Sequence, residues 1–324
     1  MEMLIQLLLL VLGFVMLVKG ADWFVDGSAS IASKFGIPQL IIGLTIVAMG
    51  TSAPEAAVSI TAAMGGNADI TIGNIVGSNI LNILIILGIT SLVYPISVQK
   101  NTLAIDIPVT IFITALLLLL GYDGKISRID AIIMLIIFIA YLSFLFVSAK
   151  KERNALLQNS VEETEITNAN SEETEIKDIP LFKAILFTII GLALIIAGSN
   201  FVVKSATFIA EKLGLSQRFI GLTIVALGTS LPELFTSVTA AIKKNSDIAI
   251  GNIIGSNIFN ILFVVGLSGL IIPVPFQTEF RFDTIISGIA AITLLLFCLP
   301  KKKLPRFAGA IMLLGYVAYF FKIW

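Results

Sequence analysis

Two glutamates stand inside long apolar runs, each at the end of a short polar motif. Glu55 ends the sequence GTSAPE and Glu233 ends the sequence GTSLPE. If these runs cross a membrane, each carboxylate costs on the order of 3 kcal/mol even on lenient insertion scales, so it usually marks an ion or proton pathway. The pair therefore predicts a polar site in the interior of an apolar protein.

The proline that precedes each glutamate should break its helix. Pro54 and Pro232 have no backbone N–H, so the carbonyls of Gly50 and Gly228 lose their helical donors. Free carbonyls at membrane depth are tolerated only where they face protein or line a polar cavity. Each motif also contributes two hydroxyl groups, from Thr51, Ser52, Thr229 and Ser230.

A second polar motif, GN-I-x-GSN-I-x-N, follows each glutamate at 73–82 and 251–260. The glycines have a small-xxx-small spacing, which favours close helix packing. Within each motif a serine and an asparagine are four residues apart and share a helix face; these are Ser78 with Asn82 and Ser256 with Asn260. The remaining amides we expect to bond between helices, namely Asn74, Asn79, Asn252 and Asn257.

All of these groups are oxygen donors. Two carboxylates, several hydroxyls, amide oxygens and freed carbonyls suit hard cations rather than metals that seek sulfur or imidazole. The charge of the two carboxylates balances one Ca²⁺ or a pair of Na⁺. No histidine occurs in the chain, and no aspartyl dyad stands out, so an intramembrane hydrolase is disfavoured. A sensor that transports nothing would not explain duplicated buried ligands.

The two motif sets belong to an internal repeat. Residues 41–82 match residues 219–260 without a gap at an offset of 178 positions, and the match extends from Gly20 and Gly198 onwards. Self-similarity at a fixed offset is typical of a duplicated structural unit. The chain is predicted to hold two copies of one unit, 1–148 and 180–324.

Composition indicates an all-α polytopic membrane protein, because 57% of the 324 residues are hydrophobic and mean hydropathy is +1.01. A formal net charge of zero gives no indication of nucleic-acid binding. The pattern predicts ten transmembrane helices, five per copy, with the second and the seventh broken. They are expected at 4–33, 38–64, 70–92, 103–121, 128–148, 181–212, 218–242, 248–271, 283–299 and 305–322.

Five spans per copy is an odd number, so the second copy should enter the membrane inverted. With both termini outside, 13 Lys and Arg residues fall on the cytoplasmic side and 6 outside, and Lys19 and Lys204 lie within helices. The positive-inside rule favours this orientation. The acidic stretch 149–179 would then be a cytoplasmic, solvated linker. Inverted repeats with broken helices are typical of secondary transporters.

The paired GTSxPE and GNxxGSN motifs resemble the alpha repeats of the sodium/calcium exchanger family, within the calcium/cation antiporter superfamily, and most of all its prokaryotic members. The resemblance implies exchange of about three Na⁺ for one Ca²⁺ across the plasma membrane, by sliding of the first and sixth helices over a fixed core. No cofactor is expected, since Na⁺ and Ca²⁺ are the transported ions, and the chain is expected to be a monomer.

The resemblance also implies roles for individual residues. Glu55 and Glu233 would bind calcium with Thr51 and Thr229. Ala48 and Ala226 would offer backbone carbonyls. Asn82 and Asn260 would lie at the centre, and the flanking sodium sites would be completed by Ser52, Ser230, Ser78 and Ser256.

Two alternatives stay open at this point. A proton/calcium antiporter, or an antiporter of another divalent cation, would also use paired glutamates, although its related motif ends in an acidic residue where this chain has Ser78 and Asn79. A cation channel fits less well, because broken inverted repeats suit alternating access. The resemblance implies that members of the potassium-dependent branch have a carboxylate at the position of Asn260, where it helps to hold K⁺. Because Asn82 and Asn260 are neutral amides, we expect exchange that does not require K⁺.

Overall fold

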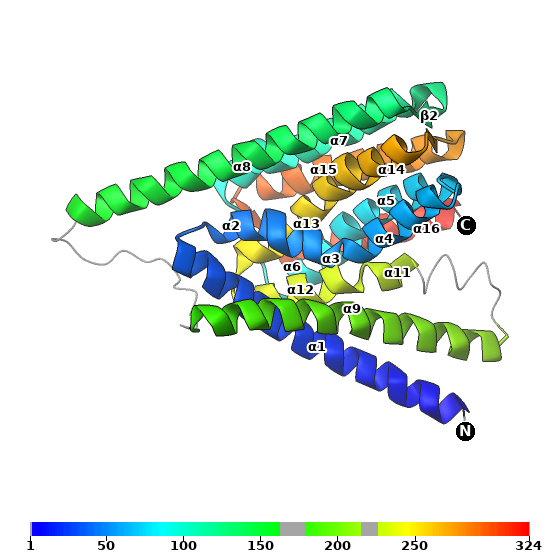
Figure 1. Ribbon diagram of the computed structural model, residues 1–324, viewed down its shortest axis with the longest axis horizontal. Helices are drawn as coiled ribbons and strands as arrows, with labels where there is room; N and C mark the ends of the chain where they lie inside the picture. The colour runs from blue at the N-terminus through cyan, green and yellow to red at the C-terminus, as the bar shows by residue number, and fades with distance from the viewer. Residues whose placement is uncertain (1, 163–178, 215–225, 324) are drawn as a thin grey trace.

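The structure is a computed structural model that describes residues 2–162, 179–214 and 226–323 (Figure 1). Most helices run roughly along the long axis of the molecule, side by side. The described residues form a helical bundle with four two-residue strands, which are β1 (Ile96–Ser97), β2 (Lys125–Ile126), β3 (Val274–Pro275) and β4 (Lys303–Leu304).

Several expected spans of the first copy consist of consecutive helical pieces. Its elements are α1 (Glu2–Phe35), α2 (Gln39–Ile42), η1 (Gly43–Val47), α3 (Ala48–Thr51), α4 (Ala53–Met64), α5 (Asp69–Leu81), η2 (Asn82–Leu87), α6 (Gly88–Val93), η3 (Thr102–Asp106), α7 (Ile107–Leu120), η4 (Gly121–Asp123) and α8 (Arg128–Glu162). α8 continues beyond the predicted helix end at 148, so the start of the expected linker is helical, and 163–178 lie outside the described residues.

The second copy repeats this order. Its described elements are α9 (Leu181–Lys212), α11 (Ala226–Thr229), α12 (Leu231–Ile242), α13 (Ser246–Ile258), η6 (Phe259–Val265), α14 (Gly266–Ile271), α15 (Thr278–Cys298) and α16 (Arg306–Ile323). The first part of the predicted helix 218–242 lies outside the described residues up to 225.

Within the described residues, seven helices are long and apolar enough to cross a membrane. A bent pair, Gln39–Thr51 with Ala53–Met64, raises the number to eight, and its two parts meet at an angle of 51°. The break falls at Ser52, two residues before Pro54, where the missing N–H was expected to interrupt the helix. The protein is a multi-span helical membrane protein, as its hydropathy predicted.

The inversion of the two copies is visible in the pairing of α1 with α9, the equivalent helices. A side-chain carbon built on Gly13, Gly20 or Gly27 would lie within 2.6–2.9 Å of a carbonyl oxygen of Gly198, Gly191 or Ala184, respectively. The numbers rise along α1 as they fall along α9, so the helices are antiparallel. Only glycine permits backbones this close.

The short strands obey the same symmetry. β1 pairs with β4 through Ile96 and Leu304, and β2 pairs with β3 through Ile126 and Val274. Adding 178 to Ile96 gives Val274, and subtracting 178 from Leu304 gives Ile126. A two-fold axis between the copies therefore relates the β1–β4 pair to the β2–β3 pair.

Burial separates two central helices from the helices around them. The membrane-spanning windows of Ser246–Ile271 and Ile70–Val93 are 94% and 78% buried, whereas the windows of α1, α8, α9 and α15 are 17–28% buried. The main apolar cluster surrounds α5 and α13, and a smaller cluster joins α1 and α9 to the core. The α1–α9 pair is thus a distinct unit packed against the core.

The helices that carry the second motif contain π-helical turns that sequence analysis did not predict. η2 begins at Asn82 and η6 contains Asn260, at equivalent places in the two copies. A π-turn inserts an additional residue into the helical spiral and often occurs at functional sites. The additional residue rotates the part of the helix that follows it, which changes which of its side chains face inward.

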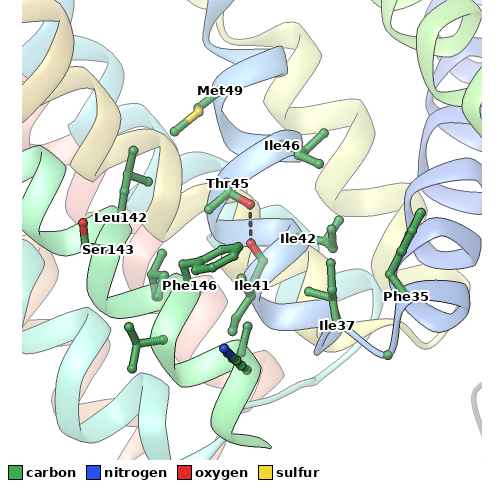
Figure 2. A pocket seen from close by; sticks show the side chains of 15 residues that line it. Phe35, Ile37, Ile41, Ile42, Thr45, Ile46, Met49, Leu142, Ser143 and Phe146 are labelled. Carbon is green, nitrogen blue, oxygen red and sulfur yellow. Dashed lines mark hydrogen bonds between the residues drawn. The ribbon is translucent and has the colours of Figure 1, made fainter. Parts of the chain in front are cut away.

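A groove between η1, its neighbours and α8 opens on the side of the bundle (Figure 2). Its lining is mostly apolar, with Ile41, Met49 and Phe146 among the residues, and it also includes Lys150. The Thr45 hydroxyl donates to the Ile41 carbonyl at 2.6 Å, so this polar group is satisfied within its own helix. Among the described residues no carboxylate lines this groove, and neither Glu55 nor Glu233 belongs to its lining.

Candidate cation site

The two broken helices bring the glutamates into the interior. α3 ends at Thr51 and α4 begins at Ala53, so Glu55 lies in the first turn of α4. Glu233 occupies the same place in α12, after Pro232. Each glutamate is only 1% exposed. A helix N-terminus favours a negative charge, which partly offsets the loss of water around each carboxylate.

Serines from the opposite copy hold each glutamate. The Ser52 hydroxyl donates to Oε1 of Glu233 at 2.8 Å, and the Ser230 hydroxyl donates to Oε1 of Glu55 at 3.3 Å. Because each serine stands three residues before the glutamate of its own copy, these crossed bonds bring the two broken helices together. Further hydroxyls lie near the same carboxylates, that of Thr229 near Glu55 and those of Thr51 and Ser256 near Glu233.

A symmetric group of four asparagines lies where α5 and α13 meet. Nδ2 of Asn82 donates to Oδ1 of Asn257 at 2.9 Å, and Nδ2 of Asn260 donates to Oδ1 of Asn79 at 3.1 Å. Asn79 and Asn257 in turn donate to each other's backbone carbonyls at 3.2 and 3.4 Å. These bonds engage one N–H of each amide group and orient Asn82 and Asn260.

Four buried oxygens are left without a hydrogen-bond donor at symmetric positions. They are Oε2 of Glu55, Oε2 of Glu233, Oδ1 of Asn82 and Oδ1 of Asn260. No lysine or arginine in the described part of the chain forms a salt bridge with either glutamate. Buried charges are normally paired or bound to a metal ion. The oxygen set fits a Ca²⁺ or Na⁺ ion as the transported substrate.

The other two asparagines of the motifs secure the broken helices, as the sequence suggested. Nδ2 of Asn74 donates to the Glu55 carbonyl at 3.2 Å and to Ser59 at 2.9 Å. Asn252 makes the equivalent bonds to the Glu233 carbonyl at 3.3 Å and to Ser237 at 2.9 Å, and its Oδ1 accepts from Thr51 at 2.9 Å.

The predicted backbone donors are placed unequally. The Ala48 carbonyl lies near the site and accepts from Thr51 at 3.3 Å and from Ser256 at 3.4 Å. Ala226 begins α11, and its surroundings lie outside the described part of the structure. Ser78 is buried on α5, one turn before Asn82.

One freed carbonyl has a partner that sequence analysis missed. The Gly228 carbonyl, freed by Pro232, accepts from the Ser199 hydroxyl of α9 at 2.6 Å. The equivalent of Ser199 in the first copy is Ala21, which has no hydroxyl. Ser199 lies 29 residues before Gly228 and outside both motifs, so the sequence does not predict this contact, and only the tertiary structure reveals it.

The glycines of the second motif pack as expected where their surroundings are described. A side-chain carbon on Gly251 would lie 2.9 Å from the Leu40 carbonyl oxygen, and one on Gly255 would lie 2.5 Å from the Leu44 carbonyl oxygen. α13 therefore lies directly against α2 and η1, and the close approach sets the position of Ser256 beside Ala48. The equivalent partner segment of the first copy falls largely in 215–225, outside the described residues.

Comparisons with known proteins agree with this geometry. The family model described as sodium/calcium exchanger protein matches residues 5–147 and 183–324. The putative antiporter CaxA of Alkalimonas amylolytica is 39% identical over 321 residues, covering 98% of both chains. The sodium/calcium exchanger MaX1 of Methanosarcina acetivorans is 34% identical over 347 residues, covering 97% of both.

The fold matches a solved transporter across its length. The sodium-calcium exchanger NCX_Mj, in a crystal soaked with Na⁺ and Sr²⁺, superposes with a TM-score of 0.82 at 32% identity, covering 98% of each chain. The family model matches each half separately, in agreement with the repeat found in the sequence. Matches of this extent and identity show common ancestry along the whole chain. The chain is a multi-span membrane transporter and belongs to the sodium/calcium exchanger family.

Proposed function

We propose that this cation exchanger moves Na⁺ against Ca²⁺ by alternating access, with about three Na⁺ for one Ca²⁺ and without a requirement for K⁺. The observation that carries the proposal is the set of four unpartnered buried oxygens on Glu55, Glu233, Asn82 and Asn260. Two of them belong to carboxylates, so the site has the charge that one Ca²⁺ balances.

Each ligand has a proposed role. Glu55 and Glu233 bind Ca²⁺ together with the hydroxyls of Thr51 and Thr229 and the carbonyls of Ala48 and Ala226. Asn82 and Asn260 offer amide oxygens at the centre. The flanking Na⁺ sites are completed by Ser52, Ser230, Ser78 and Ser256. Support comes from the hydroxyls that bond both carboxylates and from the symmetric placement of the unpartnered oxygens.

The proposed orientation places both termini outside the cell and the 149–179 segment in the cytoplasm of a plasma-membrane protein. The excess of lysine and arginine on that side supports it. Cysteine introduced at Lys302 should react with an impermeant thiol reagent only from the cytoplasm, and cysteine at Lys125 only from outside. Reaction of both from one side would contradict the inverted arrangement.

The direct test is calcium flux in proteoliposomes. Vesicles loaded with Na⁺ should take up Ca²⁺ when diluted into sodium-free medium, and vesicles without a sodium gradient should not. Uptake that is driven equally well by a proton gradient, with Na⁺ absent, would support the alternative of a proton/calcium antiporter. Flux that continues without any counter-gradient would indicate a channel.

Independence from K⁺ is tested in the same vesicles. Asn260 offers a neutral amide oxygen, so an additional monovalent cation would enter a low-dielectric site without an additional ligand charge. With the sodium gradient constant and the voltage clamped, uptake in choline should equal uptake in potassium. A strict requirement for K⁺ would overturn this interpretation of Asn260.

A further inference from the structure

One cluster of charges departs from the two-fold symmetry of the molecule. Lys243 directly follows α12, and its Nζ lies 2.6 Å from Oδ1 of Asp22 and 2.6 Å from Oδ1 of Asp26, both on α1. The same Nζ donates to the Asp22 backbone carbonyl at 2.9 Å. The Lys243 and Asp26 side chains are 23% and 14% exposed, so water screens this cluster only in part.

The first copy cannot form the equivalent cluster. At an offset of 178 positions, Lys243 corresponds to Gly65, Asp22 to Asn200 and Asp26 to Lys204. The equivalent positions thus hold no side chain, a neutral amide and a positive charge. This cluster therefore joins α1 to the core on one face of the membrane, and the equivalent positions cannot repeat it on the other face.

Packing is unequal in the same sense. α1 lies along α12, where Phe14 and Phe235 approach with ring centroids 6.3 Å apart. The symmetric counterpart of this contact would join α9 to α4, and those two helices make only sparse contact. In this structure α1 therefore packs against α12 on the face that carries Lys243. On the opposite face, α9 does not pack against α4 in the same way.

We propose that Lys243, Asp22 and Asp26 form a one-sided latch that favours the conformation closed at the end of α12. The inference rests on the proposed alternating access, in which the two end conformations are related by exchanging the copies. A symmetric molecule would populate both equally. Moving α1 along the core separates Asp22 and Asp26 from Lys243, and no equivalent ion pairs form on the other face to replace them.

The location of the latch suits this role. Lys243 stands at the C-terminus of α12, where a positive charge interacts favourably with the helix dipole. It can therefore remain in place while α1 moves. The two aspartates are four residues apart on one face of α1, so a single ammonium group contacts both.

The test measures the distance across the opposite face in nanodiscs, with spin labels on cysteines introduced at Thr61 of α4 and Leu213 after α9. Both positions are exposed, and the native Cys298 is buried. Lys243→Gln should raise the ratio of short to long distances about fivefold, the upper end of what one partly exposed ion pair contributes. Asp22→Asn with Asp26→Asn should reproduce this shift, and combining all three changes should add little.

Lys244→Gln is the matched control, because it removes the neighbouring charge and leaves the latch intact; its distance distribution should equal that of the unsubstituted protein. A second variant moves the latch to the opposite face by Gly65→Lys, Asn200→Asp and Lys204→Asp. A side-chain carbon at Gly65 would have its nearest contact at 3.4 Å, so the lysine fits. This variant should also favour the short distance, and more strongly when combined with Lys243→Gln.

Equal distributions for Lys243→Gln and Lys244→Gln would overturn the latch, as would a single distance population in every variant. Sodium-driven calcium uptake is measured separately on the unsubstituted protein. Absence of uptake together with a shifted distance ratio would refute the ion exchange and keep the latch. Normal uptake together with an unshifted ratio would refute only the latch.

Discussion

Glu55 and Glu233 are both 1% exposed and receive hydrogen bonds from hydroxyls, which carry no charge. Hydroxyl donors lower the free energy of a buried carboxylate but do not neutralise it. One oxygen of each carboxyl group is left without a donor. At the scale of residues, the two carboxylates therefore fit the proposed cation site.

Replacing either glutamate should abolish exchange without unfolding the protein. Glu55→Gln or Glu233→Gln halves the charge that balances Ca²⁺, so calcium affinity should fall roughly 100-fold or more, in line with the loss of one partner of a buried charge pair. Uptake under a sodium gradient and calcium binding by calorimetry are the measurements. Glu279→Gln, on the surface of α15, is the control and should transport normally.

The same variants should be at least as stable as the original protein when no ion is present. The amide removes an uncompensated buried charge, which is unfavourable in the ion-free state. Thermal unfolding in detergent, with and without Ca²⁺, separates this effect from ligand binding. A large fall in the ion-free unfolding temperature would show instead that the carboxylates have a structural role.

At the scale of elements, two devices position the site. Prolines divide the second and seventh helices so that Glu55 and Glu233 begin new helices deep in the bundle. Glycines bring backbones together, on α13 against the broken helix and between α1 and α9. The broken helices hold the proposed ligands, and the glycine contacts of α1 and α9 keep that pair together as one unit.

Enlarging Gly20 should damage the α1–α9 unit. A side-chain carbon there would lie 2.8 Å from the Gly191 carbonyl oxygen, so Gly20→Val must force the helices apart. Overpacking of this kind typically destabilises by about 1–3 kcal/mol. We expect a lower unfolding temperature and several-fold slower exchange. Gly315→Val, on α16 where nothing lies within 4 Å, should change neither.

At the scale of the whole molecule, two inverted copies enclose the proposed site, whose charge is −2 when both carboxylates are ionised. With the proposed stoichiometry, one Ca²⁺ would balance this charge, whereas about three Na⁺ would leave the loaded site with one positive charge, so one half of the cycle would move net charge across the membrane. Moving one charge through 100 mV changes the free energy by about 2.3 kcal/mol.

Exchange should therefore depend on voltage. Sodium-driven calcium uptake should accelerate when the vesicle interior is made positive and slow when it is made negative, because each cycle carries one excess charge outward with the three Na⁺. The measurement is uptake with the potential set by valinomycin and potassium gradients. Uptake that is indifferent to the potential would indicate a neutral stoichiometry of two Na⁺ per Ca²⁺.

The sequence by itself was sufficient to predict the class of protein, the duplication and the two buried glutamates. Hydropathy of this strength requires a membrane, and a gapless offset of 178 residues requires two copies of one unit. Glu55 and Glu233 were recognisable because a carboxylate beside a proline in an apolar run has few structural explanations. These features are local in sequence or repeat at a fixed spacing.

Tertiary structure alone decided the contacts between distant residues. The crossed bonds from Ser52 and Ser230, the hydroxyl of Ser199 on the Gly228 carbonyl and the pairing of Lys243 with α1 join segments that are 29 to 221 residues apart. Sequence periodicity describes one helix at a time, whereas the rotation and sliding position of neighbouring helices depend on how all side chains pack. The π-turns at Asn82 and Asn260 also rotate their helices locally. No pattern of residues in the sequence predicts these turns.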